Sequence, residues 1–132
     1  MKRTLLGLLP LLVACATKSE IKMLPQDAGV KAVYKETYEK VRRAAQDTAA
    51  EFGFKTKEEG MKDEHTWHFL ASQGMSSGTS GRYLRVVIPT GEAERGVYVV
   101  VRSKAESVEN QRMDDLLAQD IHKKIAGRLS TK

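Results

Sequence analysis

Two stretches of helical apolar periodicity frame this chain, and they constrain its fold more than any other feature. In the first, apolar or small residues recur every three or four positions along one side of a helix. They are Tyr34, Tyr38, Val41, Ala45, Thr48 and Phe52. The second, near the C-terminus, comprises Met113, Leu116, Leu117, Ile121, Ile125 and Leu129. Each helix therefore has one apolar side that must be buried against another element.

The sequence also predicts the boundaries of these helices and of the strands around them. Gly53 follows the first stripe directly and is typical of a helix end, and Ser107 is a plausible N-cap for the last helix. Strand patterns are expected at residues 30–35, 54–57, 65–72, 82–88 and 97–102. A charged turn is expected at 58–64 and a Ser/Gly-rich loop at 73–81. The last two strands should be antiparallel neighbours, because their connection is too short for a parallel crossover.

Both helices need an apolar surface, and an antiparallel sheet supplies one. We therefore expect an α+β fold, a two-layer sandwich in which two helices pack on one face of an antiparallel sheet of four to five strands. The other face would be open, or covered only by long polar side chains. Because neither an internal repeat nor a second compositional zone is present, residues 30–132 are expected to form one domain.

The first residues are organised as an export signal. Lys2 and Arg3 give a positive start, and residues 5–13 form an apolar run. The small residue Ala14 then precedes Cys15, the only cysteine of the chain. The apolar run is about half of the roughly 20 residues that cross a hydrocarbon core, so a permanent spanning helix is not expected. An ordinary secretory signal with an unrelated cysteine is the alternative.

The segment Leu12-Val13-Ala14-Cys15 resembles the lipobox of bacterial lipoproteins. The resemblance implies that residues 1–14 are a signal peptide cleaved between Ala14 and Cys15. It also implies a diacylglycerol on the Cys15 sulfur and an acyl chain such as palmitate on its new amino group. Two or more chains hold a protein on a membrane, so this anchor would be effectively permanent. Ala16 after the cysteine implies, by the same resemblance, sorting to the outer membrane, with the domain facing the periplasm.

Residues 15–29 are expected to form the lipidated cysteine and a flexible tether. The segment is polar and has neither helical nor strand periodicity. Three apolar residues are the exception, and they could dock locally on the domain: Ile21, Met23 and Leu24.

Candidate metal and phosphate sites have simpler explanations. His65 and His68 are three residues apart in an expected strand, so their side chains point to opposite faces and cannot bind one metal ion together. With His122 on the last helix, all three histidines are expected at the surface, and no metal or cofactor is expected. The Ser/Gly-rich loop lacks the following helix that a phosphate loop needs. A mobile hairpin loop is expected there, with a contact to a partner as the alternative.

Catalytic patterns are equally sparse. The Gly-x-Ser-x-Gly spacing does not occur, and paired carboxylates such as Asp114-Asp115 are explained as solvated charge on a helix. No catalytic residue is assigned, and the chain is not expected to be an enzyme. Two basic clusters are expected to form solvated helix exteriors, although they could meet acidic lipid or protein: Lys40, Arg42 and Arg43, and Lys123, Lys124 and Arg128. The net charge of +5 does not by itself indicate nucleic acid as a partner.

The pattern of Tyr38-Glu39-Lys40-Val41 and Glu51-Phe52-Gly53-Phe54, followed by strands and a last amphipathic helix, looks like small bacterial lipoproteins of unknown function. It is also loosely similar to helix-grip modules in an accessory lipoprotein of the outer-membrane β-barrel assembly machine. This resemblance implies a scaffolding or assembly role with an envelope protein as partner. Binding of a small apolar or lipid ligand is the alternative, and a periplasmic hydrolase comes third. The sequence leaves the oligomeric state open.

Overall fold

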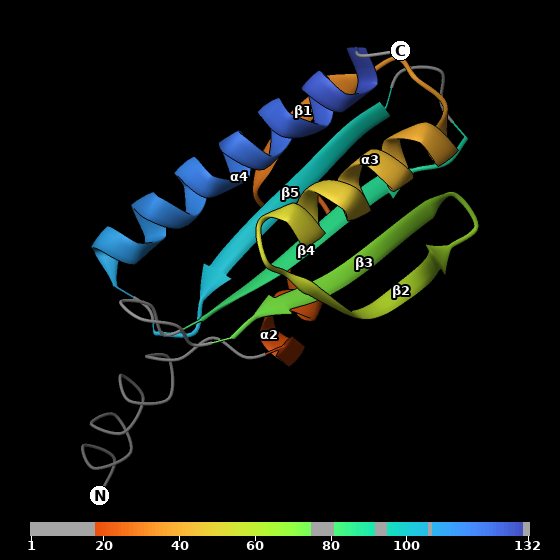
Figure 1. The fold of residues 1–132 in the computed structure, drawn as a ribbon. Coiled ribbons are helices and arrows are strands. Elements are labelled where there is room, and N and C mark those ends of the chain that lie inside the picture. The colour runs from red at the N-terminus through yellow and green to blue at the C-terminus, as the bar shows by residue number, and fades with distance from the viewer. Residues whose placement is uncertain (1–17, 75–80, 92–94, 106, 131–132) are drawn as a thin grey trace, which may run out of the picture.

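The computed structural model describes residues 18–74, 81–91, 95–105 and 107–130; the expected signal peptide and Cys15 lie outside these ranges. The elements in chain order are α2 (Lys18–Met23), β1 (Val30–Tyr34), α3 (Tyr38–Glu51), β2 (Lys55–Asp63), β3 (Thr66–Gln73), β4 (Arg82–Pro89), β5 (Arg95–Ser103) and α4 (Val108–Ser130). The strands form one sheet in the order β1-β5-β4-β3-β2, and every neighbouring pair is antiparallel. The expected α+β two-layer sandwich is confirmed, with α3 and α4 on one face of the sheet (Figure 1).

The main core lies between the sheet and these two helices. Phe69, Val86 and Val99 stand directly opposite one another on β3, β4 and β5, and all three are fully buried. Each such side chain stabilises the fold by about 1.5–3 kcal/mol on burial. From the helix layer, α3 contributes Val41 and α4 contributes Ile121, both fully buried. The apolar side expected for α3 therefore closes the core, and of the stripe expected for α4 the buried residues Ile121 and Ile125 do so.

Helix α3 ends where the sequence indicates but begins at Tyr38, because Tyr34 of the expected stripe lies in β1. The Thr37 side chain accepts a hydrogen bond from the backbone N–H of Lys40, so Thr37 is the N-cap. At the other end, Gly53 has a φ of +88°, a conformation that costs glycine little.

Helix α4 is rotated relative to the expected stripe. Its buried residues include Asp114 and His122 as well as apolar side chains, whereas Met113 and Leu116 are 45% and 46% exposed. Leu117 is only partly buried against the core. The expectation was wrong at these positions because apolar periodicity ignores polar side chains that find partners inside a fold.

Strand β2 is longer than expected. The segment 58–64, interpreted as a charged turn, continues the strand to Asp63, and the turn lies at residues 64–65. Strand β2 lies at the edge of the sheet, and most of its side chains remain in solvent. An edge strand of this kind tolerates charged residues. Two register irregularities interrupt its pairing with β3, between Thr56 and Glu58 and between Met61 and Asp63.

The expected tether is corrected from Lys18 onward. Residues 18–29, called the strap below, lie across the sheet face opposite α3 and α4, which we call the outer sheet face. Ile21 is buried against Leu70 of β3 and Val100 of β5, so a second small core holds the strap down. The outer sheet face is thus partly covered by the chain itself, not left open.

Candidate functional site

The outer sheet face centres on a buried cation. Arg85 of β4 is 1% exposed, and its guanidinium is enclosed by the strap. Nη1 donates to the carbonyl oxygens of Ile21 at 3.1 Å and Leu24 at 2.7 Å, and Nη2 donates to that of Pro25 at 2.5 Å. The last carbonyls of a helix lack partners within the helix, so the end of α2 offers natural acceptors. Burial, assisted by the nearby positive charge of Arg102, lowers the pKa of Arg85.

Further contacts fix both ends of the strap. Lys22 Nζ lies 2.9 Å from Glu58 Oε2 on β2, and Gln26 Nε2 donates to Asp63 at 3.4 Å. Gly29, with a φ of +98°, passes so close to β5 that a Cβ atom there would collide with the Val99 carbonyl oxygen. The strap is therefore held at β2, β3, β4 and β5, and its path over the sheet is defined by residues from four strands.

Cations and tyrosines surround the strap on the outer sheet face. Lys31 Nζ lies 5.7 Å from the ring centroid of Tyr98, and Lys104 Nζ lies 5.1 Å from that of Tyr83. The cations that the contacts and strand register place on this face are Lys22, Lys31, Lys55, Arg102 and Lys104. Its carboxylates include Glu58, which contacts Lys22 and His68, and Asp63, which bonds to Gln26. We find here a basic, tyrosine-bearing surface that the sequence analysis missed, because its residues come from separate strands.

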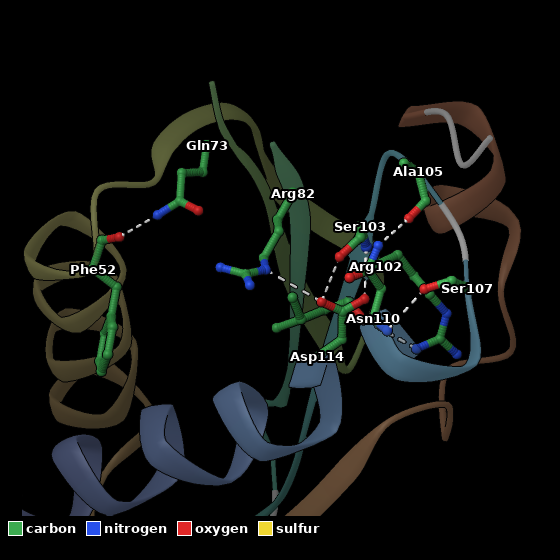
Figure 2. A network of polar contacts seen from close by, with 10 residues as sticks. Phe52, Gln73, Arg82, Arg102, Ser103, Ala105, Ser107, Asn110 and Asp114 are labelled. Carbon is green, nitrogen blue, oxygen red and sulfur yellow. Dashed lines mark hydrogen bonds and ion pairs between the residues drawn. The ribbon is translucent and has the colours of Figure 1, made fainter. Parts of the chain in front are cut away.

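The end of the sheet near the start of α4 is fixed by a buried carboxylate (Figure 2). Asp114 is 2% exposed. Its Oδ2 accepts from the Ser103 backbone N–H at 2.7 Å, and its Oδ1 accepts from Ser103 Oγ at 2.7 Å and from Arg82 Nε at 3.3 Å. The expectation that Asp114 is solvated surface charge was wrong. The carboxylate instead ties α4 to the beginning of β4 and the end of β5.

Figure 2 also shows how the backbone is secured on either side of this carboxylate. Ser107 Oγ accepts from the backbone N–H of Asn110 at 3.0 Å, which confirms the expected N-cap of α4. The Asn110 side chain donates to the Ala105 carbonyl at 2.6 Å, and Gln73 donates to the Phe52 carbonyl at 2.7 Å. These groups are therefore engaged in holding the connections at this end of the fold.

A second buried polar pair joins β1 to α4. Tyr34 Oη lies 2.7 Å from His122 Nδ1, and His122 Nε2 lies 2.7 Å from the Val30 carbonyl oxygen. Because a carbonyl only accepts, Nε2 carries the proton and Nδ1 accepts from the Tyr34 hydroxyl. Burial lowers the pKa of His122, although its bond to Val30 opposes the effect, and burial raises the pKa of Tyr34. Both side chains are engaged inside the fold, so the pair serves to fix the edge strand.

The three histidines do not meet. His65 is exposed in the β2–β3 turn, whereas His68 is buried on the outer sheet face and lies 3.4 Å from Glu58. His122 lies on the buried side of α4, so the expectation of surface histidines holds only for His65. Within the described ranges, no group of three or more potential ligands is placed to hold a metal ion. The expected Ser/Gly-rich loop falls largely at residues 75–80, outside the described residues.

The helix layer carries mixed charge and some exposed apolar side chains. A groove of about 700 Å³ between α3 and α4 is bordered by Lys40, Arg43, Asp47 and Arg128, among other residues. It lies on the solvent side of the helices and is not an enclosed cavity beneath α3. Arg128 contacts Glu51 at 3.2 Å, in agreement with a solvated exterior.

Three apolar residues on the first half of α4 are exposed. Val108 is 86% exposed, and Met113 and Leu116 face solvent on the side of the helix away from the core. On the strap, Met23 is 82% exposed. Among the described residues, no helix is both long enough and apolar enough to cross a membrane.

Comparison with protein families finds no match, and comparison with curated proteins finds none either.

Proposed function

We propose that this chain is a lipid-anchored protein of the bacterial cell envelope with a non-enzymatic role in protein interaction. The anchor is the lipid on Cys15 that the lipobox resemblance implies, and the location that follows is the periplasmic side of the outer membrane. The observation that carries the interaction role is the exposed apolar surface of Val108, Met113 and Leu116 on α4. Large apolar side chains that remain exposed along one helix offer a contact surface to a protein partner.

The arrangement of the remaining polar groups supports this assignment. The buried Ser103–Asp114 and Tyr34–His122 pairs are both engaged in contacts between elements of the fold. The groove between α3 and α4 is bordered by charged side chains, which suit an apolar ligand poorly. Protein interaction is accordingly favoured over the alternatives of a lipid-binding pocket or a hydrolase.

Photo-crosslinking in living cells tests the interaction role. A photoreactive amino acid at Leu116 should capture one defined envelope protein. The matched control places the same group at Lys123, an exposed residue farther along α4. We expect the adduct at position 116 alone, and loss of it when Met113 is also changed to Glu. Equal, unspecific labelling at both positions, together with turnover of an envelope substrate by the purified protein, would overturn the proposal.

A further inference from the structure

The outer sheet face and the anchor lie close together along the chain. Only Ala16 and Thr17 separate Cys15 from Lys18, the first residue of α2. Three successive Cα–Cα steps span at most about 11 Å. The strap that starts at Lys18 is itself fixed to the sheet through Arg85 and Ile21. A lipid on Cys15 therefore reaches the domain through a very short connection that leads directly onto the outer sheet face.

We propose that the outer sheet face rests on the membrane surface and that its cations contact the phosphate groups of anionic lipids. This inference rests on the lipid anchor of the proposed function and adds an orientation to it. The helix layer lies on the opposite face of the sheet and is itself about 10 Å thick. The short connection thus places α3 and α4 away from the bilayer, where the apolar surface of α4 is available to a protein partner.

The chemistry of the outer sheet face fits this occupant. Lys22, Met23, Lys31 and Lys55 are exposed around the strap, and Lys104 is partly exposed above the ring of Tyr83. Lysines near a bilayer are attracted by anionic headgroups, tyrosines favour the interface, and an exposed methionine can enter the headgroup region. In the helix layer, Lys40 pairs with Glu36 and Lys124 with Glu51. On the outer sheet face Lys22 pairs with Glu58, whereas Lys31 and Lys104 lie over tyrosine rings.

The orientation is tested on the lipidated full chain in vesicles of phosphatidylethanolamine and phosphatidylglycerol. Because lipidation occupies the only native thiol, one added cysteine can carry a fluorophore, as Met23→Cys on the strap or Gln119→Cys on the exposed side of α4. Lipids with a nitroxide at the headgroup should quench the label at position 23 at least threefold more than that at position 119. Equal quenching, or stronger quenching at 119, would overturn the orientation, including the case in which a protein covers the outer sheet face.

A second measurement tests the membrane contact of the outer sheet face independently of the lipid anchor. In the Cys15→Ser chain, we compare binding to phosphatidylglycerol vesicles for two triple variants of equal charge. Lys31→Gln/Lys55→Gln/Lys104→Gln alters the outer sheet face, and Lys40→Gln/Lys123→Gln/Lys124→Gln alters the helix layer. Each cation near an anionic surface is worth roughly a fivefold change in binding, so the first variant should lose more than about tenfold and the second should change little. Equal losses would contradict the inference even if Cys15 is lipidated, and an unlipidated Cys15 with the expected pattern would contradict only the anchor.

Discussion

Replacing Arg85 with Met tests whether a buried cation holds the strap on the sheet. The change keeps an apolar stem and removes three hydrogen bonds to the carbonyls of Ile21, Leu24 and Pro25. A hydrogen bond with one charged partner contributes about 1.5–3 kcal/mol, but a buried charge also costs several kcal/mol in desolvation. The net stabilisation by the Arg85 side chain is therefore much smaller than the sum of its three hydrogen bonds.

The loss has an upper limit, because the strap can leave the sheet and return its carbonyls to water. Undocking then loses mainly the burial of Ile21, worth about 1.5–3 kcal/mol. We expect Arg85→Met to lower the free energy of unfolding by about 2–3 kcal/mol, measured by urea denaturation of the Cys15→Ser chain. Cleavage by trypsin after Lys22 should become at least tenfold faster, since about 1.4 kcal/mol of local docking corresponds to a factor of ten.

Arg102→Met is the matched control. Arg102 is half-buried, donates to the Val101 carbonyl at 3.0 Å, and its charge disfavours the ionised form of Arg85. Its removal should leave the strap as protected as in the parent protein. If Arg85→Met keeps both the parent stability and a protected Lys22, or if it lowers stability by more than about 5 kcal/mol, the reasoning is refuted.

Three further predictions concern the buried polar groups and the strap. Asp114→Asn should lower the free energy of unfolding by about 2–3 kcal/mol, because an amide cannot accept all three bonds from Ser103 and Arg82, whereas Asp115→Asn on the exposed side should change it little. The pKa of His122 is lowered in the folded state, so its contribution to stability is complete above about pH 7 and declines as the pH falls below the unfolded value of about 6.5. His122→Gln should accordingly flatten the stability profile between pH 7 and pH 5 in urea titrations, and an unaltered slope, or the same flattening in His65→Gln, would count against this assignment. Gly29→Ala should free the strap to trypsin, because its Cβ collides with β5 at a positive φ, whereas Gly127→Ala in open space on α4 should not.

The sequence predicts the architecture where burial is encoded locally. Val41 and Ala45 recur with helical spacing, and Trp67 and Phe69 alternate along a strand, so the core-facing sides of α3 and β3 follow from neighbouring residues alone. The short connection between β4 and β5 likewise predicts their antiparallel pairing.

The features that the sequence does not predict depend on partners far along the chain. His122 is buried because it meets Val30, 92 residues away, and Arg85 is buried because it meets Pro25, 60 residues away. Apolar periodicity gives neither polar residue a reason to be inside. The strap has only Ile21 and Leu24, three residues apart, to indicate a docked helix, and its polar composition favours a tether instead.

The same limit applies to the basic outer sheet face. Lys31 and Tyr98 lie 67 positions apart in sequence but become neighbours through the pairing of β1 with β5. Strands β1 and β5 are neighbours in the sheet but lie far apart in the sequence. The contact therefore follows from the strand order and not from any local motif. Of the two parts of the proposal, the sequence alone indicates only the lipid anchor at Cys15.

Mass spectrometry of the N-terminal peptide from the protein in its own bacterial envelope tests the central claim most directly. The account predicts a chain that begins at Cys15 and carries a diacylglycerol on sulfur and an acyl chain on nitrogen. A free thiol at Cys15, or a mature chain that begins at any other residue, would contradict it.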